Sequence, residues 1–138
     1  MNIQQYKQML EQPWGKIQYE ITFAQLAYLK NKKILDFGSG LGLVSQFLGE
    51  NNEVVAIEPE KEMLFAYPNH TYKKVLGSLE QVEKFEAESF DIVLCHNVLE
   101  YIEKNNRENY LSELKRVLKQ DGKLSIIKHN QVGKIMQA

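Results

Sequence analysis

Short apolar runs alternate along this chain with segments in which apolar residues recur at helical spacing. The apolar runs predict β-strands over residues 32–37, 53–58, 72–76, 90–95 and 123–128. The segments of helical spacing predict helices over residues 16–31, 41–49, 60–66, 79–85 and 106–119. This alternation is typical of an α/β domain with a parallel sheet, and the chain is long enough for one such domain.

Two of the predicted helices carry apolar residues that fall on one face at helical spacing. The first face consists of Ile17, Ile21, Ala24 and Tyr28. The second face consists of Tyr110, Leu111, Leu114, Val117 and Leu118. Gly122 is predicted to end the second helix. Ser78 is predicted to cap the helix over 79–85, with Gln81 as its capping-box partner.

The composition narrows the class of protein. Of 138 residues, 43% are hydrophobic and 25% are charged, and the formal net charge of -1 provides no bulk attraction to nucleic acid. The single cysteine, Cys95, forms no intramolecular disulfide or zinc cluster, and we expect it to be buried at a strand end. His70 and His129 lack ligand spacing, so we expect no metal. Without a membrane-spanning run or an apolar signal core, the sequence predicts a soluble cytoplasmic protein.

The most informative motif is the turn Asp36-Phe37-Gly38-Ser39-Gly40-Leu41-Gly42, which follows a predicted strand and precedes a predicted helix. Glycines permit a tight turn and let the backbone approach a ligand without a Cβ in the way. The motif therefore indicates a ligand site, and a turn that only reverses the chain is the alternative. Leu43 stands where dinucleotide folds have a third glycine, which disfavours a nicotinamide-dependent oxidoreductase.

A strand-ending acid, a G-x-G-x-G turn and a second acid at the end of the next strand resemble the class I S-adenosylmethionine-dependent methyltransferases. The resemblance covers about residues 12–130. It implies S-adenosylmethionine as cofactor and a Rossmann-like doubly wound parallel sheet in the order 3-2-1-4-5. The family has two further strands after the fifth, and this chain is expected to lack them. The activity it implies is methyl transfer, and a module that binds the cofactor without turnover is the alternative.

The same resemblance assigns residues at the turn to the cofactor: Asp36, Gly38, Ser39, Gly40 and Gly42. Asp36 is assigned to the amino-acid end of the cofactor, and an acid that only caps the turn is the alternative. Glu58, 22 positions after Asp36, is assigned to the ribose hydroxyls, because it alone ends the apolar run VVAI. Its alternative role is a solvated loop acid like its neighbours Glu60 and Glu62.

The adenine and the mouth of the site are assigned to later segments. Ser78 or the Leu79 backbone N–H is expected to meet the ring, although Ser78 also suits a plain helix cap. Pro59 and Met63 are expected to pack on the adenine faces. The alternative for Met63 is a place in the core, where methionine is found more often than at a ligand.

The exit of the fourth strand supplies two further candidates, His96 and Asn97. His96 is interpreted either as a general base or as a residue that lines the cofactor.

The resemblance also suggests an arrangement of the whole chain, namely one domain over 1–138 with a lid at about 1–31 and a core at about 32–130. Tyr6, Trp14 and Tyr19 either belong to this lid or cap the core.

The Trp-Gly pair, the segment HNVLEYI and the tail HNQVGKIM are similar to methyltransferases that esterify a carboxymethoxy group on the tRNA wobble uridine. From these resemblances we expect the acceptor to be a small molecule or a tRNA base. Because the fifth strand is expected to have an open edge, we expect a homo-oligomer joined at this edge. Exchange of residues 130–138 between the chains is one form that this assembly can take.

Overall fold

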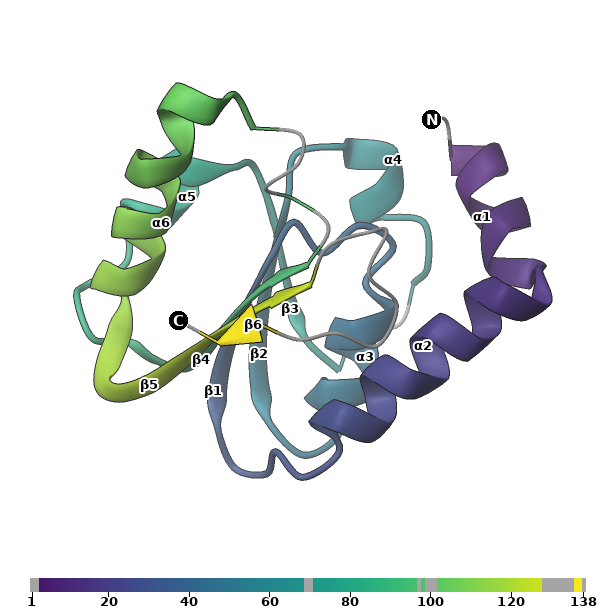
Figure 1. Ribbon diagram of the computed structural model, residues 1–138, viewed down its shortest axis with the longest axis horizontal. Coiled ribbons are helices and arrows are strands. Elements are labelled where there is room, and N and C mark those ends of the chain that lie inside the picture. The colour runs from purple at the N-terminus through teal and green to yellow at the C-terminus, as the bar shows by residue number, and fades with distance from the viewer. Residues whose placement is uncertain (1–2, 69–70, 97, 99–101, 128–135, 138) are drawn as a thin grey trace.

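The computed structural model describes residues 3–68, 71–96, 98, 102–127 and 136–137 (Figure 1). Its strands are β1 Lys33–Phe37, β2 Glu53–Glu58, β3 Lys73–Leu76, β4 Phe90–His96, β5 Leu118–Ile127 and β6 Met136–Gln137. Its α-helices are α1 Ile3–Glu11, α2 Pro13–Leu26, α3 Leu43–Gly49, α4 Lys61–Leu64, α5 Leu79–Val82 and α6 Arg107–Arg116. A 3-10 turn, Lys104–Asn106, precedes α6.

The strands form one sheet in the order β3-β2-β1-β4-β5-β6. The first five strands are parallel and have the predicted order 3-2-1-4-5. The two central pairings meet at β1, where Ile34 is opposite Val54 of β2 on one side and Ile92 of β4 on the other. Parallel strands covered on both faces consist of nearly continuous apolar residues, as β2 does.

Helices cover both faces of the sheet, as expected for a doubly wound fold (Figure 1). On one face, α5 and α6 pack on a core that includes Leu35, Phe90 and Leu114. On the other face, α2 and α3 pack on a core that includes Ile34 and Leu48. Successive residues of β1 thus serve opposite cores, which follows from the period of two in a strand.

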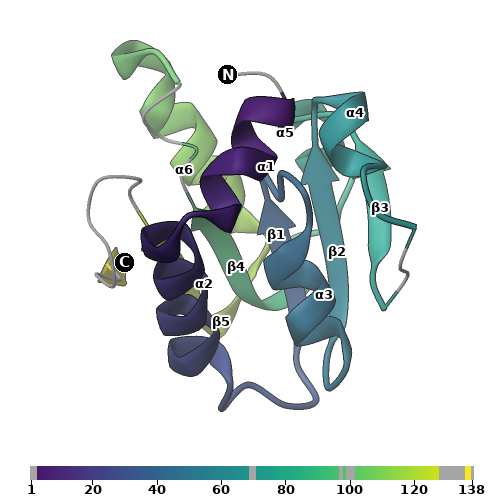
Figure 2. The same cartoon turned by 90° about the vertical axis from the view of Figure 1, so that its right-hand side faces the viewer.

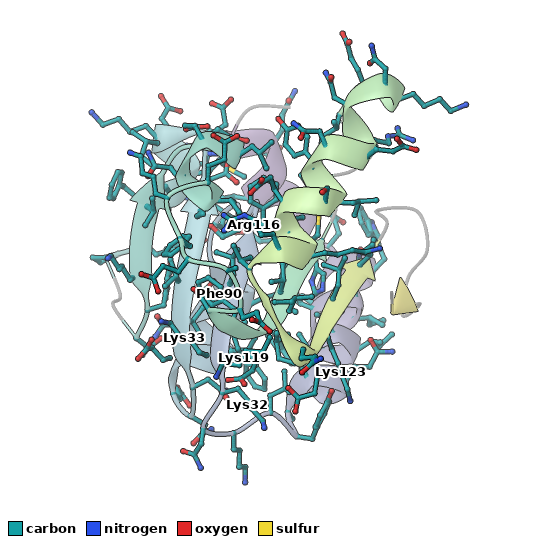
Figure 3. All side chains as sticks on the ribbon, turned by 90° about the vertical axis from the view of Figure 1, so that its left-hand side faces the viewer. Lys32, Lys33, Phe90, Arg116, Lys119 and Lys123 are labelled. Carbon is teal, nitrogen blue, oxygen red and sulfur yellow. The ribbon has the colours of Figure 1, made fainter. Side chains whose placement is uncertain are left out.

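The prediction for the end of α6 is wrong. The helix ends at Arg116, Leu118 already belongs to β5, and Gly122 lies inside that strand. Leu118 is opposite Phe90 and Lys123 is opposite Ile92, so the residues between them form an irregularity in the pairing. Lys119, which comes from this irregular segment, pairs with Asp91 of β4 at 3.2 Å beside Phe90 (Figure 3). Pairing with β4 therefore decides the structure of residues that also fit a helical period.

The apolar face of the helix predicted over 16–31 is not the buried face of α2. Ile17 is 52% exposed, and Tyr28, which follows the end of α2 at Leu26, is 61% exposed. The residues that α2 buries are Thr22 and Leu26, and the Phe23 ring stacks on Phe47 of α3 at 4.5 Å between centroids. The helix also begins three residues earlier than expected, at Pro13, and α1 was not predicted at all.

The expected open edge at the fifth strand is also corrected. The short strand β6 pairs antiparallel with β5, with Gln137 opposite Ser125 and Met136 opposite Ile126. The chain thus supplies an additional strand at the place where we expected none. The edge of β5 is occupied at these two residues, and pairing of another chain along the rest of this edge stays a prediction.

Candidate cofactor-binding site

The glycine turn joins the carboxyl end of β1 to α3, next to the end of β2 (Figure 2). All three of its glycines have positive φ angles: +78° for Gly38, +58° for Gly40 and +82° for Gly42. Side chains of L-residues rarely adopt this conformation. The N–H groups of Gly38 and Ser39 both donate to the Ile57 carbonyl, at 2.8 and 3.1 Å, so the turn is fixed to β2.

The three glycines are enclosed to different degrees. A Cβ at Gly38 would overlap Val98, and a Cβ at Gly42 would overlap the Tyr72 hydroxyl. A Cβ at Gly40 would meet only the Met63 Cε atom, at 3.7 Å. Gly38 and Gly42 are therefore required by packing within the protein, whereas the open space lies at Gly40.

Glu58 faces this turn from the end of β2. Glu58 is only 7% exposed, and its Oε1 accepts a hydrogen bond from the Gly40 N–H at 2.8 Å. Its Oε2 accepts a hydrogen bond from the Glu60 N–H at 2.9 Å. Glu60 and Glu62 are exposed. Among these three acids, Glu58 is therefore the one whose carboxylate the fold directs to the glycine turn.

Asp36 lies behind the turn. It is 3% exposed, and its Oδ2 accepts a hydrogen bond from the Ser45 hydroxyl of α3 at 2.7 Å. Burial raises the pKa of Asp36 to about 6; the Ser45 hydrogen bond opposes this shift and the nearby Glu58 charge adds to it. The N-cap residue of α3 is Gly42, so Asp36 connects β1 to α3 through Ser45 and does not cap the helix itself.

A buried polar atom in the turn lacks a partner. The Ser39 Oγ atom is buried and makes no hydrogen bond within the described part of the chain. A buried hydroxyl without a partner costs free energy. A polar group of a bound ligand would supply the missing hydrogen bond.

The loop after β3 approaches the same edge, since the Gly77 N–H donates to the Glu58 carbonyl at 3.1 Å. Ser78 does occupy the N-cap position of α5, but its side chain makes no capping hydrogen bond. Its N–H donates instead to Glu80 Oε1 at 2.9 Å, so the predicted capping box with Gln81 does not form. The Leu79 side chain is buried in the core. Met63 of α4 is half-buried beside Gly40. Pro59, which lies between β2 and α4, is exposed.

His96 ends β4, and its Nε2 lies 3.3 Å from the Ser125 hydroxyl of β5. Desolvation lowers the pKa of His96 to about 4, so the imidazole is neutral at neutral pH.

Burial raises the pKa of Cys95 to about 12, and the charge of Asp36 adds to the shift, which agrees with the expected unreactive buried thiol. Asn97 lies outside the described residues.

The helix α1 lies at the same end of the molecule as the carboxyl ends of β1 and β2 (Figure 2). Lys7 Nζ lies 5.1 Å from the centroid of the Tyr67 ring, which connects α1 to the segment after α4. Trp14 is half exposed and does not cap the core, whereas the Tyr19 ring packs on Phe23. The side chain of Tyr6 lies outside the part of the chain that the structure describes.

A hollow of about 680 Å³ lies at the opposite end of the strands, around Lys32, Lys33 and Lys119 (Figure 3). Its lining contains four lysines and three acids, and two of the lysines form ion pairs: Lys33 with Glu53 at 3.7 Å and Lys119 with Asp91. Charges that are nearly balanced within the lining give this hollow no clear preference for an anion.

Neither a metal site nor a membrane span is found in the described ranges. They contain no group of three or more His, Cys, Asp or Glu residues that could hold a metal ion. Within the same ranges, no helix is long and apolar enough to cross a membrane.

This combination of a parallel sheet in the order 3-2-1-4-5, a G-x-G-x-G turn after β1 and an acid at the end of β2 defines the class I methyltransferase fold. The family described as "Methyltransferase domain" matches residues 35–126. The chain therefore belongs to the S-adenosylmethionine-dependent methyltransferase family.

Individual relatives agree with this assignment. The mitochondrial ubiquinone biosynthesis O-methyltransferase of Rattus norvegicus is 34% identical over 113 residues, which cover 75% of this chain and 32% of that protein. The ubiquinone biosynthesis O-methyltransferase of Glaesserella parasuis is 30% identical over 80% of this chain and 53% of that protein. The chain thus spans about a third to a half of the length of these relatives.

A solved structure shows the same fold. It is the phosphoethanolamine N-methyltransferase 1 of Haemonchus contortus, in complex with phosphoethanolamine and S-adenosylhomocysteine. Its TM-score is 0.72 at 19% identity, and the match covers 91% of this chain and 29% of that chain.

Proposed function

We propose that this chain binds S-adenosylmethionine against the glycine turn and takes part in methyl transfer to an acceptor oxygen. The observation that carries the proposal is the open side of Gly40, with the Glu58 carboxylate on one side. The Ser39 hydroxyl, which has no partner among the described residues, lies next to it in the turn. When bound, the cofactor would supply a sulfonium methyl group for transfer to the acceptor.

The residues at the turn fit the polar parts of this cofactor. A carboxylate has about four acceptor positions, so Glu58 retains capacity for the two ribose hydroxyls beyond its two backbone hydrogen bonds. The ionised form of Asp36 favours a nearby cation, which suits the sulfonium and the amino group. Gly38, Ser39, Gly40 and Gly42 then line the methionine part.

We assign the adenine end to the loops after β2 and β3. Pro59 and Met63 follow β2, and Ser78 and the Leu79 N–H follow β3. The hydrogen bond between Gly77 and Glu58 supports this assignment, because it holds the two loops together. His96 and Asn97 are assigned to the methyl-bearing side, and α1 with the start of α2 is assigned to a lid.

The names of the curated relatives support a hydroxyl acceptor. A His96 side chain with a pKa near 4 is a weak general base, so we infer that acceptor placement contributes more than proton removal by this residue. A tRNA acceptor and a cytoplasmic location stay predictions from the sequence. The relatives named as enzymes favour turnover over a module that only binds.

Titration calorimetry tests the cofactor. We expect binding of S-adenosylmethionine and S-adenosylhomocysteine and none of NAD. Gly40→Val should abolish binding and leave a folded domain, because the new side chain fills the open space at a residue of positive φ. Unchanged binding by this variant would show that the turn is only structural. Assays of S-adenosylhomocysteine release with phenolic acceptors and with total tRNA then compare the acceptor classes.

A further inference from the structure

Exposed apolar side chains gather on the outer face of α2. Trp14 and Ile17 are 50% and 52% exposed. With Ile21 and Ala24, they form a stripe in which successive members are separated alternately by three and four residues. We call these four residues the α2 outer stripe. This spacing places them on one side of a helix and is the spacing of helices that pack side by side.

The opposite side of α2 is already buried. Thr22 and Leu26 face the sheet, and Phe23 stacks on α3. The helix therefore has an apolar face toward the core and a second apolar face toward solvent. The exposed residues Lys16 and Glu20 lie between these two faces, so the outer stripe is a separate exposed apolar surface that is available to a partner.

The stripe is complementary to itself when two copies pack antiparallel. In that register Trp14, its largest member, lies over Ala24, its smallest, and Ile17 lies against Ile21. Large residues facing small ones allow two helices to pack closely. The register repeats each contact through the two-fold axis, as a symmetric dimer requires.

The charges beside the stripe also suit an antiparallel pair. Lys16 and Glu20 are both exposed and lie on the same flank of α2. Two-fold symmetry turns this flank toward the same flank of the second copy. The two lysines and two glutamates then form a cluster of alternating charge near the axis, which favours this orientation.

We propose that the α2 outer stripe is the interface of a symmetric homodimer with antiparallel α2 helices. The interface is small. Burial of the exposed parts of Trp14 and Ile17 removes on the order of 200 Å² of side-chain surface per copy. Because this is well below the area of a standard stable interface, we expect a dimer that dissociates on dilution.

Sedimentation velocity and tryptophan emission test the interface in the intact chain. Trp14 is the only tryptophan, so its emission reports directly on the stripe. With rising protein concentration we expect a monomer-to-dimer shift and a parallel blue shift of the emission. Ile17→Asp should abolish both. The matched control Phe65→Asp, at a side chain 56% exposed on another surface, should retain both.

The register has its own test. Trp14→Ala should weaken the dimer, Ala24→Trp should weaken it by crowding Trp14, and the double variant should restore it because the large and small positions are exchanged. A wild-type chain that stays monomeric at high concentration would overturn the proposal. So would equal loss of the dimer in Ile17→Asp and Phe65→Asp, or binding of the stripe to lipid vesicles by a chain that never dimerises.

Discussion

At the residue scale, Glu58 combines two tasks. Its carboxylate holds the glycine turn through the Gly40 N–H and lies at the position from which a ribose diol can be bound. Removal of this side chain therefore affects the shape of the turn as well as a contact to the cofactor. Glu60 contributes only its N–H to the same arrangement, and its own side chain is exposed.

We expect Glu58→Ala to weaken cofactor binding by ~1.5–3 kcal/mol, the scale of lost hydrogen bonds to a charged group. The loss should be equal for S-adenosylmethionine and S-adenosylhomocysteine, because both carry the ribose. Calorimetric titration measures both affinities, with Glu60→Ala as the control. Unchanged affinity in Glu58→Ala together with a loss in Glu60→Ala would identify the other acid as the ligand.

Asp36 and His96 make stability depend on pH in opposite directions. Asp36 has a folded-state pKa of about 6, above its ordinary value of 3.8, so its contribution to stability is lost as pH rises through 6. His96 has a folded-state pKa of about 4, below its ordinary value of 6.5, so its contribution is lost as pH falls toward 4. Between about pH 4 and 6 the two effects oppose each other.

We expect Asp36→Asn to become less stable on acidification through this window more steeply than the parent chain, because only the effect of His96 remains. His96→Gln should show the opposite slope. Urea denaturation at several pH values measures both. If the free energy of unfolding varied with pH in the same way for the parent chain, Asp36→Asn and His96→Gln, the assigned pKa shifts would be contradicted.

At the element scale, strands were easier to predict than helices. The bounds of β2 match the prediction residue for residue, because Asn52 and Pro59 end its apolar run on both sides. The helix α2 carries apolar residues on two faces, and periodicity alone does not tell which face meets the sheet. The end of α6 depends on pairing between β4 and β5, which a local pattern does not contain.

The observed orientation of α2, with Phe23 toward α3, leads to a prediction about stability. We expect Phe23→Ala to destabilise the fold by ~1–3 kcal/mol, because it removes the stack on Phe47 and leaves a gap between α2 and α3. Ile17→Ala, on the outward face, should change the stability of the monomer by no more than about 0.5 kcal/mol. Denaturation at a concentration low enough to exclude association measures both. A larger loss of stability in Ile17→Ala than in Phe23→Ala would show that the face with Ile17 is the buried one.

At the scale of the whole molecule, the strand order assembles the site. The order 3-2-1-4-5 brings the carboxyl ends of β1, β2, β3 and β4 to one edge. The glycine turn and Glu58 were predictable, because their places follow from strand ends. Ser45, Tyr72 and Val98 were not, because each approaches the turn only through tertiary packing and no local spacing marks it.

The other end of the strand order depends on β6. Paired with Ser125 and Ile126, this short strand covers part of an edge whose N–H and C=O groups would otherwise be free. We expect Met136→Pro, which removes a backbone donor, to accelerate hydrogen exchange at the β5 amides that face β6 by roughly five- to tenfold. Met136→Val retains the donor and should exchange like the parent chain. The α2 outer stripe is untouched, so sedimentation should show the same monomer–dimer equilibrium in Met136→Pro as in the parent chain, with additional larger species of this variant at high concentration. Identical exchange in the two variants would mean that β6 does not protect this edge in solution.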